Sequence, residues 1–314
     1  MKKIGGIAYL VFVLLSVVVL AWQLFYYKLT PQTADYQLVT LLPTASTASW
    51  QAEDSLTLSE SRQQLDDQLS AQAYLLIELD SRTVILGKNL DTTLPPASTT
   101  KLMTALVALD LYQLDEVVTV SPEVARDNNA IGLLANEQLT VRNLLIATLV
   151  SSANDAAYAL AEYAPGGLPF FIGQMNQRAE QWGLDRTHFE NPTGYDDPPN
   201  VSTARDLSVL VMKALEEPML VEWLSLPAYR ITNITGRVPH LLETTNQMLG
   251  VDPRVIGGKT GTTALAREVL VTLAEHNQRQ YLIIVMNTEN RYGDTERLLN
   301  WLGTNVGWQP GADF

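Results

Sequence analysis

The chain reads Pro-Pro-Ala-Ser-Thr-Thr-Lys-Leu-Met-Thr-Ala-Leu-Val-Ala-Leu at residues 95–109. The proline pair ends whatever element precedes it, because proline removes a backbone donor and fixes φ. Beyond the prolines, apolar residues recur at helical spacing, at Leu102, Leu106 and Leu109. This spacing predicts a helix that begins near Ser98.

Ser98 and Lys101 lie three positions apart, so the predicted helix places both on one face, with the amine in reach of the hydroxyl. Unpaired N–H groups and the macrodipole at a helix N-terminus favour a developing anion on that serine. A nucleophile beside a base is the minimal unit of covalent acyl transfer. A capping serine followed by a solvated lysine explains the same pair, so this motif does not decide by itself.

A second motif is Ser152-Ala153-Asn154, at the start of another predicted helix. Serine and asparagine both accept hydrogen bonds from free N–H groups, so helix capping is again the alternative explanation.

A third motif is Lys259-Thr260-Gly261-Thr262, on a predicted strand. A phosphate-binding loop would need glycine at position 253, where the chain has Pro253. A cation among small residues on a strand instead indicates a sheet edge on which an extended peptide can lie. Gly261 would let the substrate backbone approach closely.

The composition narrows the function classes. The chain has 314 residues, 46% of them hydrophobic, which is enough for a sizeable core. A net charge of −13 argues against a nucleic-acid partner, which needs a basic stripe. The chain has no cysteine, and His188, His240 and His276 lack metal-ligand spacing. We therefore expect no metal site, and the mechanism implied by the family resemblance described below needs no organic cofactor either.

The N-terminus predicts a membrane anchor. Lys2 and Lys3 precede an almost uninterrupted apolar run over 4–24, which is long enough to cross a bilayer as a helix. Lysines before the run place the N-terminus in the cytoplasm and the rest of the chain outside. We assign 1–28 to a single-pass anchor in the cytoplasmic membrane and 29–72 to a polar spacer. A cleaved signal peptide is the alternative, but no small-x-small site closely follows the run.

The remaining pattern indicates an α+β domain over 73–305, followed by a short tail at 306–314. The predicted strands are 73–79, 83–86, 255–262, 269–274 and 281–286, and the predicted helices begin at 98 or span 141–150, 154–163, 169–182, 203–215 and 294–302, with another short helix at 56–69. Because strands stand at both ends and helices between them, we expect a mainly antiparallel sheet that joins the N-terminal hairpin to the C-terminal strands.

Taken in order, the three motifs resemble those of penicillin-recognising serine peptidases and serine β-lactamases. Their flanks are most similar to the D-alanyl-D-alanine carboxypeptidases, the low-molecular-mass penicillin-binding proteins. The matching segments are Pro-Ala-Ser-Thr-Thr-Lys-Leu-Met-Thr-Ala-Leu (96–106), Ser-Ala-Asn-Asp-Ala-Ala (152–157), Asn-Pro-Thr-Gly (191–194) and Gly-Gly-Lys-Thr-Gly-Thr-Thr (257–263). The resemblance covers about residues 73–303 and implies the β-lactamase/DD-peptidase fold.

The resemblance also implies catalytic roles. Ser98 would attack the carbonyl of the penultimate D-Ala of a peptidoglycan stem peptide, and neutral Lys101 would take its proton. A lysine serves as a base near pH 7 only if burial or another cation lowers its pKa, and Lys259 is the obvious neighbouring cation. Ser152 would relay a proton to the leaving amine. Asn154 would orient Lys101 and the substrate amide.

The same resemblance implies the substrate-binding residues. Backbone N–H groups of Ser98 and Thr262 would form the oxyanion hole, and the strand carrying Thr260 and Gly261 would bind the peptide. Arg291, before the last predicted helix, would bind the terminal carboxylate of the substrate, since arginine offers two parallel donors. A surface arginine paired with a neighbouring acid is the alternative. β-Lactams would be covalent inhibitors.

The chain departs from the family pattern in two places. Many relatives carry a C-terminal β-rich domain and a C-terminal anchor, whereas we expect an N-terminal anchor. Where relatives have Ala-Gly, this chain has Ala266-Arg267-Glu268, and a bulky charge there would alter which stem peptide fits.

Three competing functions stay open from the sequence. The first is a class A β-lactamase, which would need Glu-x-x-Leu-Asn, and 190–193 does not match that pattern. The second is transpeptidase or endopeptidase activity, which differs from carboxypeptidase activity only in the acceptor and the shape of the substrate. The third is a non-catalytic module that binds penicillin or the cell wall.

Overall fold

The computed structural model describes residues 50–51, 55–127 and 130–308. The predicted anchor at 1–28 and the first part of the predicted spacer lie outside the described residues. Within the described ranges, no helix has the length and apolar character needed to cross a membrane.

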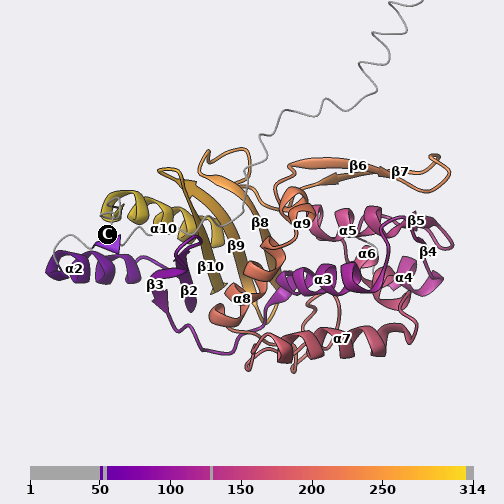
Figure 1. Cartoon of the computed structure of the whole chain (residues 1–314), viewed down its shortest axis with the longest axis horizontal. Helices are drawn as coiled ribbons and strands as arrows, with labels where there is room; N and C mark the ends of the chain where they lie inside the picture. Colours follow the sequence, from indigo (N-terminus) through magenta and orange to yellow (C-terminus); the bar gives the residue numbers. More distant parts are fainter. Residues whose placement is uncertain (1–49, 52–54, 128–129, 309–314) are drawn as a thin grey trace, which may run out of the picture. The chain divides into compact units, whose positions relative to one another are not determined.

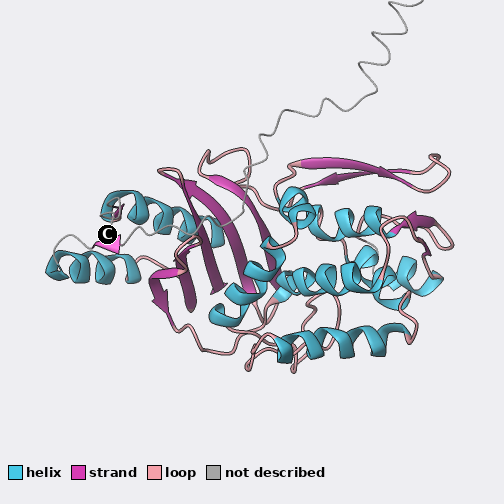
Figure 2. Cartoon of the chain, viewed as in Figure 1, coloured by secondary structure: helices cyan, strands magenta, loops and turns pink. Residues whose placement is uncertain are grey.

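The elements follow one another as Figures 1 and 2 show. The strands are β1 (Trp50–Gln51), β2 (Ala73–Glu78), β3 (Thr83–Lys88), β4 (Val117–Thr119), β5 (Gln138–Thr140), β6 (Ala228–Thr232), β7 (Pro239–Glu243), β8 (Val255–Thr263), β9 (Arg267–His276), β10 (Arg279–Thr288) and β11 (Gly307–Trp308). The helices are α2 (Ser55–Asp66), the 3₁₀ turn η1 (Ala97–Thr100), α3 (Lys101–Leu111), α4 (Pro122–Asp127), α5 (Val141–Val150), α6 (Asn154–Glu162), α7 (Gly167–Gln181), α8 (Ala204–Leu215), α9 (Pro218–Leu224) and α10 (Arg291–Asn305).

The main sheet has five strands in the order β3-β2-β10-β9-β8, and every neighbouring pair is antiparallel. β2 pairs with β10 from Ala73↔Met286 to Glu78↔Tyr281, which joins the N-terminal hairpin to the C-terminal strands as the sequence predicts. β8 is an outer strand of this sheet, so one of its edges has no strand partner among the described residues and can pair with an extended peptide.

Both faces of the sheet are buried, and the side chains of β10 alternate between two cores. Leu282 and Ile284 pack with the helices α3, α5, α6 and α8. Tyr281 and Ile283 pack on the opposite face with residues of α2 and α10. This explains why β10 reads as a continuous apolar run rather than as alternating polar and apolar residues.

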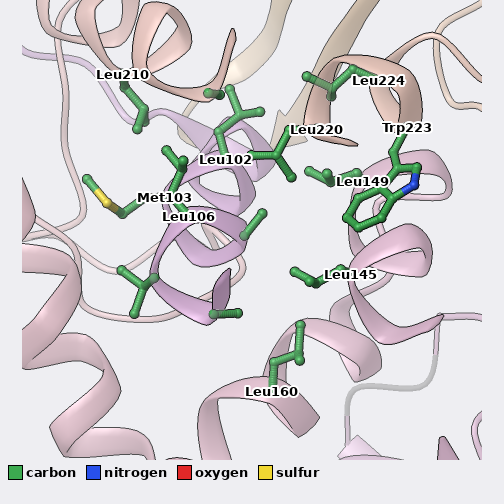
Figure 3. Close-up of a cluster of buried hydrophobic side chains, with 14 of the residues drawn as sticks. Leu102, Met103, Leu106, Leu145, Leu149, Leu160, Leu210, Leu220, Trp223 and Leu224 are labelled. Atoms are coloured by element: carbon green, nitrogen blue, oxygen red, sulfur yellow. The ribbon is translucent and has the colours of Figure 1, made fainter. Parts of the chain in front are cut away.

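The helical part is built around α3. Leu102 and Leu106 of α3 are buried, and Figure 3 shows them among leucines of α5, α6, α8 and α9. Residues Lys101 to Ala108 of α3 are all buried, so this helix is enclosed by its neighbours rather than amphipathic. The Ser98–Lys101 motif at its start is therefore held by a helix that its neighbours enclose.

The described part of the predicted spacer is folded against the sheet. Leu65 and Leu69 are buried in the same core as Trp301 of α10. The Trp301 indole Nε1 donates to the Ser61 hydroxyl at 2.7 Å, and Ser61 donates to Asn305 at 3.0 Å. The folded domain therefore includes residues 55–72 in addition to residues 73–305, which the sequence pattern predicts.

The remaining predicted elements are found with small shifts of their ends. Thr140 caps α5 by accepting from the Asn143 N–H at 3.2 Å, as the sequence predicts. The short elements α4, α9, β4, β5, β6 and β7 have no counterpart in the sequence prediction. Strands of three to five residues and helices of six or seven carry too few periods to be distinguished from loops.

Candidate active site

A strained turn presents Ser98. Ala97 has φ 48°, in the left-handed region that non-glycine residues rarely adopt. Ser98 follows in η1, and α3 begins only at Lys101, so the serine lies in a 3₁₀ turn rather than in the predicted α-helix. The two helical segments are continuous, and the Ser98 Oγ lies 3.0 Å from the Lys101 Nζ. The predicted pair is therefore in hydrogen-bonding contact.

Lys101 is fully buried, and its amine also donates to the Thr193 carbonyl at 2.8 Å. Burial holds the pKa of Lys101 well below its usual range, and the neighbouring charge of Lys259 lowers the pKa further. Asp155 opposes this by raising the pKa. Burial thus contributes more to the shift than the cation that the sequence singled out. The amine is suited to accept a proton near neutral pH.

The turn at 191–194 places the carbonyl that Lys101 meets. The Asn191 Oδ1 accepts from the backbone N–H groups of Thr193 at 3.1 Å and Gly194 at 2.7 Å. Gly194 has φ 82°, and a Cβ there would lie 1.8 Å from the Ala97 carbonyl oxygen. Only glycine fits this contact. In the sequence, this turn is one of the segments that resemble the family, and its Asn-Pro-Thr-Gly pattern is typical of an Asx turn. The contact between this turn and Lys101 could not be predicted from the sequence.

Ser152 and Lys259 form a second hydroxyl–amine pair beside the first. Lys259 is buried, and its Nζ donates to the Ser152 Oγ at 2.7 Å and to the Thr260 carbonyl at 3.0 Å. Ser152 itself has φ 55°, a second strained residue in the site. Burial, with a smaller effect of the Arg291 charge, lowers the pKa of Lys259 to about 7.

Asn154 begins α6 close to this pair, and its Nδ2 donates to the Tyr195 hydroxyl at 2.7 Å. The next residue, Asp155, is fully buried and accepts from the backbone N–H groups of Ala130 and Ile131, each at 3.1 Å. Asp155 belongs to the segment at 152–157 that resembles the family, but its contacts could not be predicted, and Tyr195 was not singled out at all, because these contacts join segments more than twenty residues apart.

The strand β8 forms the other side of the candidate active site. The Thr260 and Thr245 hydroxyls are hydrogen-bonded to each other. The structure shows a packing reason for glycine at position 261. A Cβ on Gly261 would lie 2.9 Å from the Ala97 Cβ and 3.0 Å from the Ser98 nitrogen. The missing side chain lets β8 pack on η1, which brings Thr262 beside Ser98.

Arg291 reaches this strand from the first position of α10. Its Nη1 donates to the Gly261 carbonyl at 2.9 Å and to the Thr262 Oγ1 at 2.5 Å. Its guanidinium lies over the Tyr292 ring, 4.9 Å from the centroid. The Arg291 Nε is buried without a partner among the described residues, which leaves a donor available at the strand. The structure thus brings Arg291 to the predicted site rather than to an ion pair with a neighbouring acid.

The three histidines lie in different surroundings. His188 pairs with Glu190 on the surface, and buried His240 pairs with buried Glu137 at 2.8 Å. Across the described ranges, no group of three or more His, Cys, Asp or Glu side chains could hold a metal ion.

A serine and a buried lysine of lowered pKa, a second serine–lysine pair and a free strand edge define an enzyme of covalent acyl transfer. Comparison with known proteins gives the same class. The family model described as D-alanyl-D-alanine carboxypeptidase matches residues 59–290. The chain belongs to the D-alanyl-D-alanine carboxypeptidase family.

Relatives include carboxypeptidases and an endopeptidase. The carboxypeptidase DacB2 of Mycobacterium tuberculosis is 35% identical over 219 residues, 69% of this chain and 74% of that protein. The D-alanyl-D-alanine endopeptidase of Pseudomonas aeruginosa is 32% identical over 253 residues, 76% of this chain and 79% of that protein. DacC of Escherichia coli is 34% identical over 251 residues, and the match covers 74% of this chain and 61% of DacC.

Solved structures agree in fold. A D-alanyl-D-alanine carboxypeptidase from Mycobacterium tuberculosis matches with a TM-score of 0.70 and 29% identity, covering 86% of this chain and 99% of that one. The Streptomyces K15 DD-transpeptidase matches with a TM-score of 0.69 and 30% identity, covering 74% and 97%. The predicted α+β peptidase fold is therefore confirmed.

Proposed function

We propose that this chain is a serine D-Ala-D-Ala carboxypeptidase that removes the terminal D-Ala of peptidoglycan stem peptides through an acyl-enzyme on Ser98. The observation that carries the proposal is the 3.0 Å contact between the Ser98 Oγ and the Nζ of fully buried Lys101. Burial keeps that amine available as a base, so the hydroxyl has a proton acceptor in place.

Acylation begins when Lys101 takes the Ser98 proton and the Oγ bonds to the carbonyl carbon of the penultimate D-Ala. The resulting oxyanion lies between the backbone N–H groups of Ser98 and Thr262, a placement supported by the packing of Gly261 on Ser98. Lys259 donates to the Ser152 Oγ, which leaves the Ser152 proton free to go to the leaving amine. The C–N bond then breaks and D-Ala departs. Lys101 restores the Ser152 proton.

Deacylation uses water. Water attacks the ester carbonyl, the ester C–O bond breaks, and Ser98 regains its proton, which releases the shortened stem peptide. Asn154 and the edge of β8 orient the peptide, and the carboxylate of the terminal D-Ala binds Arg291, Lys259 and the Thr260 hydroxyl. No step of this chemistry calls for a metal or an organic cofactor.

Two of the competing functions fit the side chains of the site less well. A class A β-lactamase needs a glutamate that activates the deacylating water, but Glu190 is exposed and pairs with His188 at 2.9 Å. A non-catalytic wall-binding module has no use for a buried lysine of lowered pKa beside a serine. Endopeptidase and transpeptidase activities share the acyl-enzyme and differ in the leaving or accepting group.

The test is release of D-Ala from a D-Ala-D-Ala peptide together with covalent labelling by a penicillin. Ser98→Ala should abolish both while the protein stays folded. Ser208→Ala, on α8, should keep both, because its hydroxyl only donates to the Arg205 carbonyl. Labelling of the Ser98→Ala protein would reject Ser98 as the nucleophile. Rapid penicillin turnover without D-Ala release would favour a β-lactamase.

We also propose that residues 1–28 anchor the enzyme in the cytoplasmic membrane with the peptidase domain outside, where stem peptides and β-lactams are found. The support is the lysine pair followed by the apolar run at 4–24. Full-length protein should stay in the membrane fraction and keep Lys2 and Lys3. A mature N-terminus beyond Tyr27 would instead identify a cleaved signal peptide.

A further inference from the structure

Two of the groups that the proposed function assigns to the terminal carboxylate of the substrate come from different elements. Arg291 begins the helix α10, whereas Thr260 lies on the strand β8. A carboxylate that binds both side chains needs them in fixed orientations, because a hydrogen bond weakens steeply away from its preferred angle. The structure shows how these orientations are set.

The guanidinium of Arg291 is bonded to β8 through one nitrogen. Nη1 donates to the Gly261 carbonyl and to the Thr262 Oγ1, so these two bonds fix the position of one prong of the fork. A planar fork that is held at one prong can still turn about it. The Tyr292 ring, over which the guanidinium lies at 4.9 Å from the centroid, sets the plane of the fork.

Tyr292 is itself held at the far end of its side chain. Its hydroxyl donates to the Thr245 carbonyl at 2.9 Å, and the Gln247 backbone N–H donates to the same hydroxyl at 3.4 Å. The ring therefore spans from α10 to the segment at 244–249, which connects β7 to β8. Without the hydroxyl, the ring would keep its place in sequence but lose this attachment.

The segment at 244–249 is a firm anchor for the hydroxyl. The Thr244 N–H donates to the Pro227 carbonyl at 2.9 Å, and the buried Asn246 side chain accepts from the Met248 N–H at 3.1 Å. Met248 is buried in the same core as the apolar side chains of α10. The Thr245 carbonyl is thus fixed relative to the helix that carries Arg291.

The side chain of Thr245 acts on the second carboxylate-binding group. Its hydroxyl is hydrogen-bonded to the hydroxyl of buried Thr260. Each hydroxyl has a single hydrogen, whereas an ionised carboxylate can only accept. When Thr245 donates to Thr260, the Thr260 hydrogen is available for the carboxylate of the substrate.

Resting on the carboxypeptidase function above, we propose that Tyr292 and Thr245 are positioning residues for the terminal carboxylate of the substrate. Tyr292 fixes the plane of the Arg291 guanidinium, and Thr245 turns the Thr260 hydrogen towards the substrate. Together they set how strongly the enzyme prefers a free terminal carboxylate to a neutral terminal amide, because hydrogen bonds to a charged acceptor are the stronger ones and depend most on this alignment.

The experiment measures kcat/KM for a peptide that ends in D-Ala-D-Ala and for the same peptide ending in D-Ala-D-alaninamide. Release of D-Ala or D-alaninamide is followed with enzyme in excess, so that slow substrates are also measured. Tyr292→Phe keeps the ring and removes only the hydroxyl. The ratio of acid to amide should fall by about fivefold, the effect of one hydrogen bond, while the amide value stays within about twofold of wild type.

Thr245→Val removes the other hydroxyl with little change of volume and should lower the ratio to a similar extent, whereas Thr245→Ser keeps a hydroxyl and should restore it. Tyr112→Phe is the matched control. Tyr112, at the end of α3 that is remote from Ser98, also donates its hydroxyl to a backbone carbonyl at 2.9 Å, that of Leu160. Its ratio should equal that of the wild type.

Equal falls for the acid and the amide would show that the two hydroxyls only support folding, and would overturn the inference. An unchanged ratio in both the Tyr292→Phe and Thr245→Val proteins would do the same. An unchanged ratio in an Arg291→Ala protein would also overturn it, because Arg291 would then not bind the carboxylate, while the acyl-enzyme on Ser98 would stand. A wild-type enzyme that releases no D-Ala would instead reject the proposed function, and this inference with it.

Discussion

At the scale of single residues, the site depends on how charges are placed around one buried amine. Lys101 meets a cation, Lys259, and an anion, Asp155, which act on its pKa in opposite directions. Because Lys101 must be neutral to accept the Ser98 proton, the acid limb of the acylation rate against pH reports this pKa.

Asp155→Asn should move that acid limb to lower pH, since the anion that stabilises protonated Lys101 is gone. The measurement is the pH dependence of the second-order rate of penicillin acylation. Asp206→Asn is the control: Asp206 is also buried in the first turn of a helix, where it accepts from the Arg186 N–H at 3.0 Å. An equal shift in both variants would mean that folding, and not charge, moves the limb.

Lys259→Gln should move the same limb in the opposite direction, to higher pH. Removing the neighbouring cation makes it easier for Lys101 to hold a proton, so more alkaline solution is needed to free the base. The height of the profile should also fall, because the hydrogen bond to Ser152 weakens, but the position of the limb is the diagnostic quantity. A limb that stays in place would show that Lys259 does not tune the base.

At the scale of elements, the site depends on how closely β8 and η1 pack. Gly261→Ala would put a Cβ 3.0 Å from the Ser98 nitrogen, so the strand must move away from the oxyanion donors. Acylation by penicillin should slow by on the order of 10²-fold, as for loss of one oxyanion donor. Gly173→Ala on α7 meets nothing within 4 Å and should leave the rate unchanged. Equal rates in the two variants would contradict this account.

The elements also show what the sequence could predict. Apolar periodicity located α5, α6 and α8 and the strands β2, β9 and β10, because long elements repeat their pattern several times. The motif spacing located Ser98 and Lys101, since three residues of helix bring them together. Contacts between distant segments, such as Thr193 with Lys101 and Asp196 with Leu265, depend on tertiary packing that no local pattern encodes.

At the scale of the whole molecule, the boundary of the peptidase domain lies earlier than composition indicates. The segment at 55–72 is polar enough to read as a spacer, with few apolar side chains. Two of these, Leu65 and Leu69, pack with α10 on the face of the sheet opposite the helices that hold Ser98. Asp66 accepts from the Tyr74 hydroxyl of β2 at 2.5 Å, which fastens the helix further. The segment at 55–72 therefore contributes to the stability of the peptidase domain and is not only a spacer.

Because α2 and Ser98 lie on opposite faces of the sheet, a substitution in α2 should lower stability without changing the acylation rate. Leu65→Ala leaves a cavity between α2 and α10, so the free energy of unfolding should fall by about 2–4 kcal/mol. The rate of penicillin acylation at 25 °C should stay near wild type, because the cavity lies on the other face of the sheet from Ser98. Leu241→Ala, at a leucine that is 69% exposed on β7, is the control and should change neither quantity. Chemical denaturation measures the free energy of unfolding, and the time course of covalent penicillin labelling measures the acylation rate. If the Leu65→Ala protein were as stable as the wild type, residues 55–72 would be only a spacer. If acylation were slower while stability stayed unchanged, α2 would influence the active site through the sheet.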